Sequence, residues 1–191
     1  MAFVAPSPID TERLLVRPVV ESDLPALLEV NASDEVTALL PYATWTSMAD
    51  AEAWLQRMRG IEATGLALQF VAALKPTDKA IGTCLLFRLE EKSARAELGY
   101  ALGRAFWGQG LMREALEALV GHAFDHMGLR RLEAEIDPRN VSSARLIRRL
   151  GFTQEGLLRQ RWVSKGEAID VEIHGLLQSE WPGRRSRADE R

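Results

Sequence analysis

The stretch Arg104-Ala-Phe-Trp-Gly-Gln-Gly-Leu-Met-Arg-Glu-Ala-Leu116 decides the fold, because two kinds of periodicity meet in it. Before it, apolar residues recur at every second position, which predicts a half-buried strand over 94–102. After it, apolar residues recur at every third or fourth position over 112–127, which predicts a packed helix. Gly108 and Gly110 lie at the junction and allow a sharp backbone turn. A strand, a glycine turn and a helix N-terminus together predict a site that binds an anion through backbone N–H groups.

Two common phosphate-binding loops do not match this stretch. A Walker loop requires Gly-Lys-Ser/Thr, whereas Gly110 is followed by Leu111 and Met112, which argues against a nucleotide kinase or GTPase. A dinucleotide-binding loop requires a third glycine or alanine three residues after Gly110, where Arg113 stands. The acidic residue that such a loop also needs after the next strand is present as Asp137, but one acidic residue there is not specific.

Two motifs carry a resemblance to a known family. The first is Trp107-Gly-Gln-Gly-Leu-Met112, and the second is Asn140-Val-Ser-Ser-Ala-Arg-Leu-Ile-Arg-Arg-Leu-Gly-Phe152. In this order they resemble the two cofactor motifs of the GNAT acetyltransferases. The first is similar to the form found in the ribosomal-protein N-terminal acetyltransferases called RimJ and RimL. Trp107 stands where the general family pattern prefers glutamine or arginine, and Met112 stands where it prefers glycine or alanine. The resemblance covers residues 9–182.

The resemblance implies the GNAT (acyl-CoA N-acyltransferase) fold, an α+β arrangement in which helices flank a mixed, mostly antiparallel sheet. Periodicity and turn residues along the chain agree with that fold. Strands are predicted over 13–19, 67–74, 80–89, 94–102, 132–136, 153–164 and 168–177, and helices over 22–30, 34–40, 47–61, 112–127 and 141–150. All of them belong to one predicted domain, residues 1–182, and the charged segment 183–191 is predicted to be a disordered tail.

The resemblance also implies that acetyl-CoA is the co-substrate. The glycine loop is expected to bind the pyrophosphate through backbone amides, helped by the dipole of the helix behind it. The strand before the loop is expected to pair with the pantetheine arm, and the helix capped by Asn140 to meet that arm and the sulfur from the other side. For Arg145 and Arg148, contact with a cofactor phosphate and a solvated helix face are both open. The residues expected to bind the cofactor are Tyr100, Leu102, Trp107, Gly108, Gln109, Gly110, Leu111, Met112, Arg113, Asn140 and Arg145.

Two residues are candidates for proton transfer. Glu97 lies in the strand before the loop, on the face opposite Tyr100; it resembles a frequent acidic position in the RimJ and RimL subgroup and is the candidate general base. A structural ion pair with Arg95 or Arg131 is the alternative role for this carboxylate. Ser143 is the candidate acid that protonates the departing thiolate. The alternative role of its hydroxyl is to satisfy the N-terminus of its helix.

Other reactive side chains are less specific. Asp170, Glu172 and His174 alternate along the last predicted strand, and they are candidates to border the amine site. His122 and His126 are one helical turn apart, but the intervening residues lack the glutamate of a zinc protease motif. We therefore expect no metal.

Composition limits the class of protein. The chain has 191 residues, of which 47% are hydrophobic, and no apolar run approaches the roughly 18 residues needed to span a bilayer. The net charge of −3 argues against general affinity for nucleic acid. The single cysteine, Cys84, lies in an apolar run, so we expect a buried thiol and a reducing cytoplasm. The first residues do not resemble a signal peptide. We expect a cytoplasmic monomer or homodimer with no membrane or nucleic-acid partner.

The pKa of the acceptor amine indicates which kind of amine the site favours. An α-amine has a pKa of about 8 and a lysine of about 10.4, so deprotonation at a pH of about 7.5 costs less than about 1 kcal/mol for the first and about 4 kcal/mol for the second. A site with weak base candidates therefore favours an α-amine, in agreement with the resemblance to RimJ and RimL. The sequence predicts an acetyl-CoA-dependent N-acetyltransferase that acts on a protein or peptide N-terminal amine. The alternatives are an antibiotic or polyamine N-acetyltransferase and a non-catalytic module that binds acyl-CoA.

Overall fold

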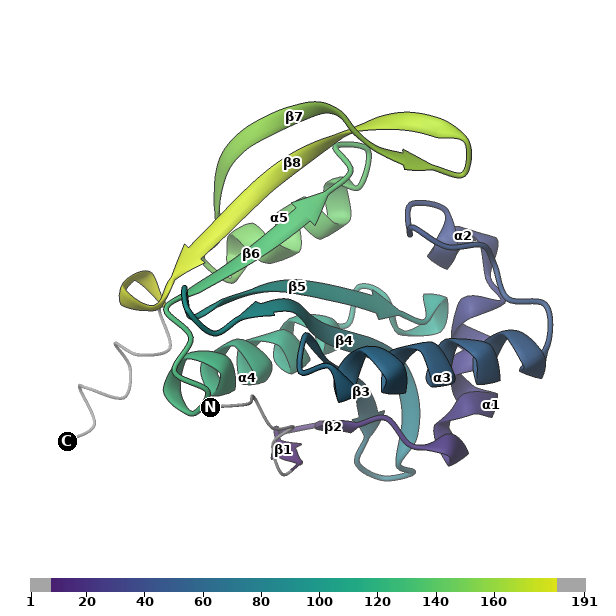
Figure 1. Cartoon of the computed structure of the whole chain (residues 1–191). Helices are drawn as coiled ribbons and strands as arrows, with labels where there is room; N and C mark the ends of the chain where they lie inside the picture. Colours follow the sequence, from purple (N-terminus) through teal and green to yellow (C-terminus); the bar gives the residue numbers. More distant parts are fainter. Residues whose placement is uncertain (1–7, 182–191) are drawn as a thin grey trace.

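The protein is built on one eight-stranded sheet (Figure 1), and the computed structural model describes residues 8–181. The strands follow the order β1-β2-β3-β4-β5-β6-β8-β7, and all neighbours are antiparallel except the parallel pair β5 and β6. Their bounds are β1 (Ile9–Asp10), β2 (Leu14–Pro18), β3 (Ala67–Leu74), β4 (Lys79–Glu90), β5 (Arg95–Leu102), β6 (Arg131–Ile136), β7 (Thr153–Ser164) and β8 (Glu167–Leu177). The predicted α+β fold with a mostly antiparallel sheet is confirmed. The predicted tail at 183–191 lies outside the described residues.

The helices are α1 (Leu24–Asn31), α2 (Asp34–Thr37), α3 (Met48–Ala63), α4 (Leu111–Asp125) and α5 (Val141–Arg149). Short 3-10 turns occupy Glu21–Asp23, Arg104–Phe106 and Gln178–Glu180. The helix predicted over 34–40 ends earlier, at Thr37, because the chain turns there and the amide of Leu40 donates to the carbonyl of Thr37. Strand β1 was not predicted, since two residues are too few to show a period.

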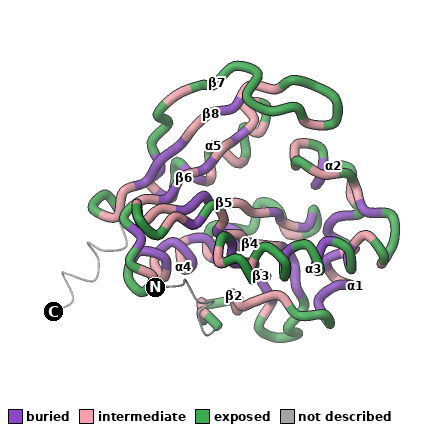
Figure 2. Tube along the Cα trace, in the orientation of Figure 1, coloured by how far each residue is buried: buried purple, intermediate pink, exposed green. Residues whose placement is uncertain are grey.

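Helices cover both faces of the sheet. On one face, α4 and α5 pack on β4, β5 and β6 around Leu116, Leu132 and Ile147. On the other face, α1 and α3 pack around Leu27 and Trp54. Figure 2 shows the buried backbone concentrated in the sheet and on the inner sides of these helices. The larger core lies on the α4 side and includes Leu98 and Leu111, so the strand–loop–helix segment of β5 and α4 is anchored by buried residues on both sides of the loop.

The parallel strands β5 and β6 separate part of the way along. They pair only at Arg95–Arg131, Ala96–Leu132 and Glu97–Glu133, although β5 continues to Leu102 and β6 to Ile136. Figure 1 shows the two strands diverging, with α5 behind them. A sheet that opens in its middle leaves backbone N–H and C=O groups without a neighbouring strand, and such groups require another partner. The opening is therefore the natural place for an extended ligand.

The β7–β8 hairpin arches away from the sheet and reaches toward α2 (Figure 1). The Nζ of Lys165, in the hairpin turn, donates to the carbonyl of Thr37 at 2.7 Å. The surface of β7 is mostly exposed, as Figure 2 shows. The hairpin and α2 thus frame one side of the opening between β5 and β6.

Candidate functional site

The glycine loop forms the predicted turn into a helix. Gly108 and Gly110 have φ angles of +75° and +76°, in the left-handed region that glycine adopts at little cost. Helix α4 begins at Leu111, and no side chain caps its first N–H groups. These groups therefore remain available to an anion, with the positive end of the helix dipole behind them.

The side chain of Met112 does not obstruct the loop. Met112 is 5% exposed, and its sulfur lies 3.9 Å from the thiol of Cys84 in the core below α4. Burial raises the pKa of the Cys84 thiol to about 12, which agrees with the predicted inert, buried cysteine. A larger residue is tolerated at this family position because its backbone faces the loop while its side chain points inward.

The loop is held in place by hydrogen bonds between Gln109 and two residues outside the motif, Arg13 and Ala105. The guanidinium of Arg13 donates to the carbonyl of Gln109 at 3.0 Å and to the carboxylate of Glu114 at 2.7 Å. The side chain of Gln109 in turn donates to the carbonyl of Ala105 at 2.9 Å. Sequence reasoning missed Arg13, since it lies far from the loop along the chain and belongs to no motif.

Strand β5 presents a free backbone edge to the opening. The amide of Gly103 donates to the carbonyl of Ile81 in the antiparallel pairing with β4. Because the hydrogen-bonding direction alternates along such a strand, Tyr100 and Leu102 turn their N–H and C=O groups away from β4. One of these groups is already used, since the indole Nε1 of Trp107 donates to the carbonyl of Leu102 at 2.7 Å. Trp107 therefore fixes the loop to the end of β5.

Helix α5 closes the other side of the opening. The amide side chain of Asn140 caps the helix by accepting from the backbone N–H of Ser143 at 3.0 Å, so the predicted cap is confirmed. The hydroxyl of Ser143 instead forms a hydrogen bond of 2.5 Å with the phenol of Tyr100. Burial raises the pKa of Tyr100 to about 12, so its proton stays bound at neutral pH. The structure thus pairs two hydroxyls across the gap, where the sequence had indicated Ser143 as a proton donor and Tyr100 only as a cofactor-binding residue.

A cleft of about 720 Å³ joins these parts. It runs from the glycine loop past Tyr100 to the first turns of α5, and α2 forms its rim. Arg145, which was predicted to bind the cofactor, lines this cleft and is exposed; Arg149 lines it too, although it was not among the predicted site residues. Arg148 turns back to donate to the carbonyl of Ala144 at 3.0 Å. With Arg113, Arg145 and Arg149 in its lining, the cleft presents positive charge to a phosphate-bearing ligand.

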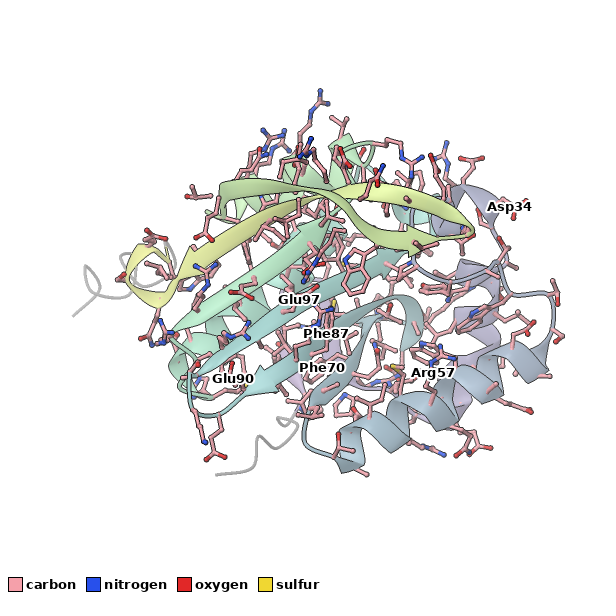
Figure 3. All side chains as sticks on the ribbon, turned by 45° about the horizontal axis from the view of Figure 1, so that its top comes forward. Asp34, Arg57, Phe70, Phe87, Glu90 and Glu97 are labelled. Atoms are coloured by element: carbon pink, nitrogen blue, oxygen red, sulfur yellow. The ribbon has the colours of Figure 1, made fainter. Side chains whose placement is uncertain are left out.

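Glu97 lies on the opposite side of the sheet from the cleft. It is the last residue of β5 that pairs with β6, and its side chain is 9% exposed. Figure 3 shows Glu97 close to Phe87 on the face below the β7–β8 hairpin. Burial raises the pKa of this carboxyl to about 7, and the nearby guanidinium of Arg88 opposes the rise. A carboxyl with this pKa at the start of the opening can accept a proton near neutral pH.

The partner of Glu97 differs from the expected ones. Arg88 Nη1 donates to the Glu97 carboxylate at 2.5 Å. The predicted partners Arg95 and Arg131 bind Glu133 instead, each at 2.8 Å. Arg88 was missed because it lies at a shift of register in β4, and alternation along a strand does not predict such irregularities.

The candidate residues on β8, the last strand, do not lie on the same face of the sheet as Glu97. His174 pairs in register with Ala134 and is fully buried, and its Nε2 lies 2.9 Å from the Glu172 carboxylate. Because side chains alternate along a strand, His174 and Glu172 lie on the α5 side of the sheet, away from Glu97. Asp170 accepts a hydrogen bond from the backbone of Gln160 in β7.

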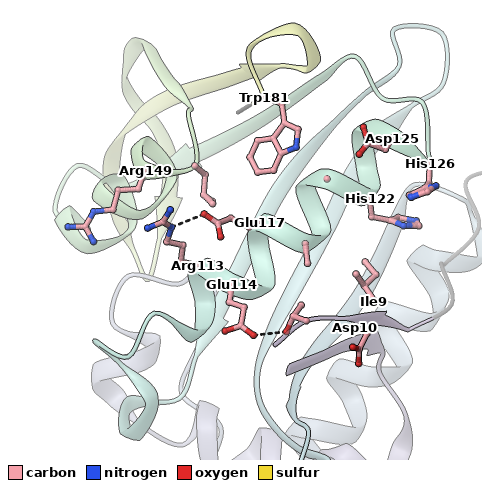
Figure 4. A pocket seen from close by; sticks show the side chains of 14 residues that line it. Ile9, Asp10, Arg113, Glu114, Glu117, His122, Asp125, His126, Arg149 and Trp181 are labelled. Carbon is pink, nitrogen blue, oxygen red and sulfur yellow. Dashed lines mark hydrogen bonds and ion pairs between the residues drawn. The ribbon is translucent and has the colours of Figure 1, made fainter. Parts of the chain in front are cut away.

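A second cavity, of about 610 Å³, lies on the outer side of α4. Figure 4 shows His122 and His126 on its wall near Asp125, with Trp181 across from them. The two imidazole rings contact each other with centroids 5.0 Å apart.

Across residues 8–181 there is no group of three or more histidine, cysteine, aspartate or glutamate side chains arranged to hold a metal ion. No helix in that range is long and apolar enough to cross a membrane.

Known proteins resemble this chain over most of its length. A family model described as an acetyltransferase (GNAT) domain matches residues 13–153. The chain is 36% identical over 173 residues to the uncharacterized N-acetyltransferase p20 of Bacillus licheniformis, covering 91% of this chain and 97% of that protein.

Two solved structures show the same fold over nearly the whole chain. A GCN5-related N-acetyltransferase from Brucella melitensis superposes with a TM-score of 0.83 and 25% identity, covering 92% of this chain and 80% of that one. The ribosomal-protein-S5-alanine acetyltransferase from Vibrio fischeri superposes with a TM-score of 0.77 and 25% identity, covering 92% and 99%. Since the family model spans most of the chain and includes both the glycine loop and α5, the protein belongs to the GNAT family of acetyl-CoA-dependent N-acetyltransferases.

Proposed function

We propose that the protein acetylates the N-terminal α-amine of a peptide or protein. The observation that carries this proposal is the Glu97 carboxyl, with its pKa near 7, at the point where β5 and β6 separate. An α-amine has a pKa of about 8, close enough to that of Glu97 for a nearly balanced proton transfer. A lysine amine, at about 10.4, makes the same transfer cost several kcal/mol more. The base is therefore matched to an α-amine.

Other residues around the opening bind the cofactor, polarise the thioester and transfer protons. The loop around Gly108 and Gly110 and the first turn of α4 hold the pyrophosphate, and the free edge of β5 directs N–H groups at the thioester carbonyl. Acetyl-CoA supplies an activated acetyl group. As the nitrogen–carbon bond forms and the carbon–sulfur bond breaks, Glu97 accepts the proton of the amine. The hydroxyl pair of Tyr100 and Ser143 then donates a proton to the sulfur.

The two alternatives are less well supported. A polyamine acceptor favours unpaired carboxylates, whereas Glu97 and its neighbour Glu135 are both bound by Arg88. A module that only binds acyl-CoA has no use for a carboxyl whose pKa is held near 7 beside the opening. A small amine without a second cation is the acceptor that competes most closely with an N-terminus.

Two peptides of the same sequence test the proposed acceptor. Both contain one internal lysine, and one has a free α-amine while the other is blocked at its N-terminus. We expect release of free thiol from acetyl-CoA only with the free peptide, and mass spectrometry of its fragments should place the acetyl group on the first residue. Equal turnover of the blocked peptide, or turnover of neither peptide beside rapid turnover of a small amine, would contradict the proposal.

A further inference from the structure

A single guanidinium lies between the two carboxylates nearest the opening. Nη1 of Arg88 donates to Glu97 at 2.5 Å and to Glu135 at 3.2 Å. Glu97 and Glu135 have side chains 9% and 12% exposed, whereas that of Arg88 is 42% exposed. The two carboxylates come from β5 and β6 and the arginine from β4, so the sheet itself creates this contact.

Aromatic rings complete the surroundings of that guanidinium. Its carbon lies 5.2 Å from the ring centroid of Trp162, in β7, and 5.6 Å from that of Phe87. The indole N–H of Trp162 donates to Glu135, which fixes the ring beside the carboxylate. Carboxylates combined with an indole face are the groups that bind ammonium and guanidinium ions in proteins. We refer to Glu97, Glu135 and Trp162 as the Arg88 site.

The backbone has an unusual conformation in the two strands that contribute Arg88 and Trp162 to this site. Of the five described non-glycine residues with positive φ, three lie in turns: Asp78, Ala94 and Lys165. The other two, Arg88 at +50° and Gln160 at +48°, lie inside strands, at shifts of register in β4 and β7. Such backbone is unfavourable for a residue with a side chain and persists where its surroundings require it. The contact between the Arg88 guanidinium and the Trp162 ring lies where these two irregularities meet.

We propose that Arg88 is a specificity-determining residue that fills a cation-binding site in the acceptor region and so excludes acceptors with a second positive charge. This inference rests on the proposed function. A diamine or polyamine that presents one amine to the opening needs a carboxylate for its other amine, and Arg88 already forms ion pairs with Glu135 and Glu97. Arg161, whose Nη2 lies 3.6 Å from Glu135, adds a second cation that repels such an acceptor. An acceptor with a single α-amine meets no such competition.

The test compares two acceptors in matched variants. Wild-type, Arg88→Met and Arg95→Met enzymes are assayed with 1,4-diaminobutane and with a peptide that has no basic residue, at a pH of about 8.5, where Glu97 is ionised. Arg95 is the control, because it also bridges two glutamates, Glu90 and Glu133, where β5 and β6 are paired. We expect Arg88→Met to raise the ratio of kcat/KM for the diamine to that for the peptide at least tenfold. We expect Arg95→Met to leave the ratio unchanged.

Two further measurements keep the result interpretable. Arg88→Lys retains the positive charge, so its ratio should stay close to the wild-type value, and Arg88→Gln replaces Arg88→Met if that variant does not fold. A ratio that is unchanged on loss of the charge, or that rises equally in Arg95→Met, overturns the role of Arg88. If wild-type enzyme prefers the diamine, the proposed acceptor is wrong, whereas the role of Arg88 is judged only by the change in ratio between enzymes.

Discussion

The phenolic oxygen of Tyr100 and the hydroxyl oxygen of Ser143 are 2.5 Å apart, although the residues belong to β5 and α5 on either side of the opening. Asn140 caps α5, so the hydroxyl of Ser143 is not needed for that purpose. Both hydroxyls border the cleft that begins at the glycine loop. We propose that this pair donates the proton to the departing sulfur.

The hydroxyl pair should act as one unit in catalysis. We expect Tyr100→Phe and Ser143→Ala each to lower kcat by about 10-fold to 100-fold with little change in the KM of the amine, because a proton donor matters only as the thiolate leaves. The double variant should be no slower than the slower single variant. Ser142→Ala, an exposed neighbour in the same cleft, is the control. Full kcat combined with a lower melting temperature would instead assign Ser143 a structural role.

The glycine loop should distinguish a negative side chain from a neutral one. Gly110 has a φ of +76°, and a side chain added there meets only the end of Arg13, at 3.7 Å. Gly110→Asp should weaken acetyl-CoA binding at least tenfold, about 1.4 kcal/mol, because its carboxylate faces the pyrophosphate. Gly110→Asn has almost the same shape and also tolerates this backbone, so it should bind more tightly than the aspartate variant. Calorimetry with equal affinities for the two variants would argue against an anion site at this loop.

Met112 should matter for stability rather than for binding. Its side chain is buried beside Cys84, so Met112→Ala should lower the free energy of unfolding by about 2–5 kcal/mol through lost contacts and a cavity. Acetyl-CoA affinity should stay close to the wild-type value, since the backbone amide remains in place. Chemical denaturation and calorimetry on the same samples measure both. A large loss of affinity with unchanged stability would mean that the Met112 side chain contacts the cofactor.

Glu97 should make stability depend on pH. Its pKa of about 7 in the folded protein lies above the ordinary value of 4.5, so the folded state binds the proton more tightly than the unfolded state does. The resulting stabilisation is complete below about pH 4.5 and is lost as the pH rises through about 7. The unfolding free energy of the wild type minus that of Glu97→Gln should therefore fall between about pH 5 and pH 8. A constant difference in urea unfolding would place the Glu97 pKa near its ordinary value.

The sequence was sufficient for the parts of the protein that repeat a local pattern. Alternation before Gly108 and helical spacing after Gly110 correctly predicted β5 and α4, and Asn140 correctly predicted the start of α5. These signals work because each arises from neighbours along the chain. The separation of β5 from β6, in contrast, depends on pairing between strands that are far apart along the chain, and no local pattern in the sequence predicts it.

The surroundings of Glu97 could not be predicted for the same reason. Arg88 reaches this carboxylate from a shift of register in β4, and Trp162, beside a shift of register in β7, contacts Arg88 and donates to Glu135. The expected partner Arg95 is two residues from Glu97 and on the same face, yet it extends toward Glu90 and Glu133. Ion pairs across a sheet depend on register to within one residue, which composition and spacing do not determine.

The dependence of the acetylation rate on pH tests the assignment of Glu97 most directly. Wild-type and Glu97→Gln enzymes are compared with a peptide that has a free α-amine, by release of thiol between about pH 6 and pH 9.5, after calorimetry has shown similar acetyl-CoA affinities. We expect wild-type kcat/KM to rise with pH through a pKa near 7. The deficit of the variant should be large at neutral pH and shrink at high pH, as the amine loses its proton unaided. A deficit that stays constant over the whole range would contradict the role of Glu97 as the base.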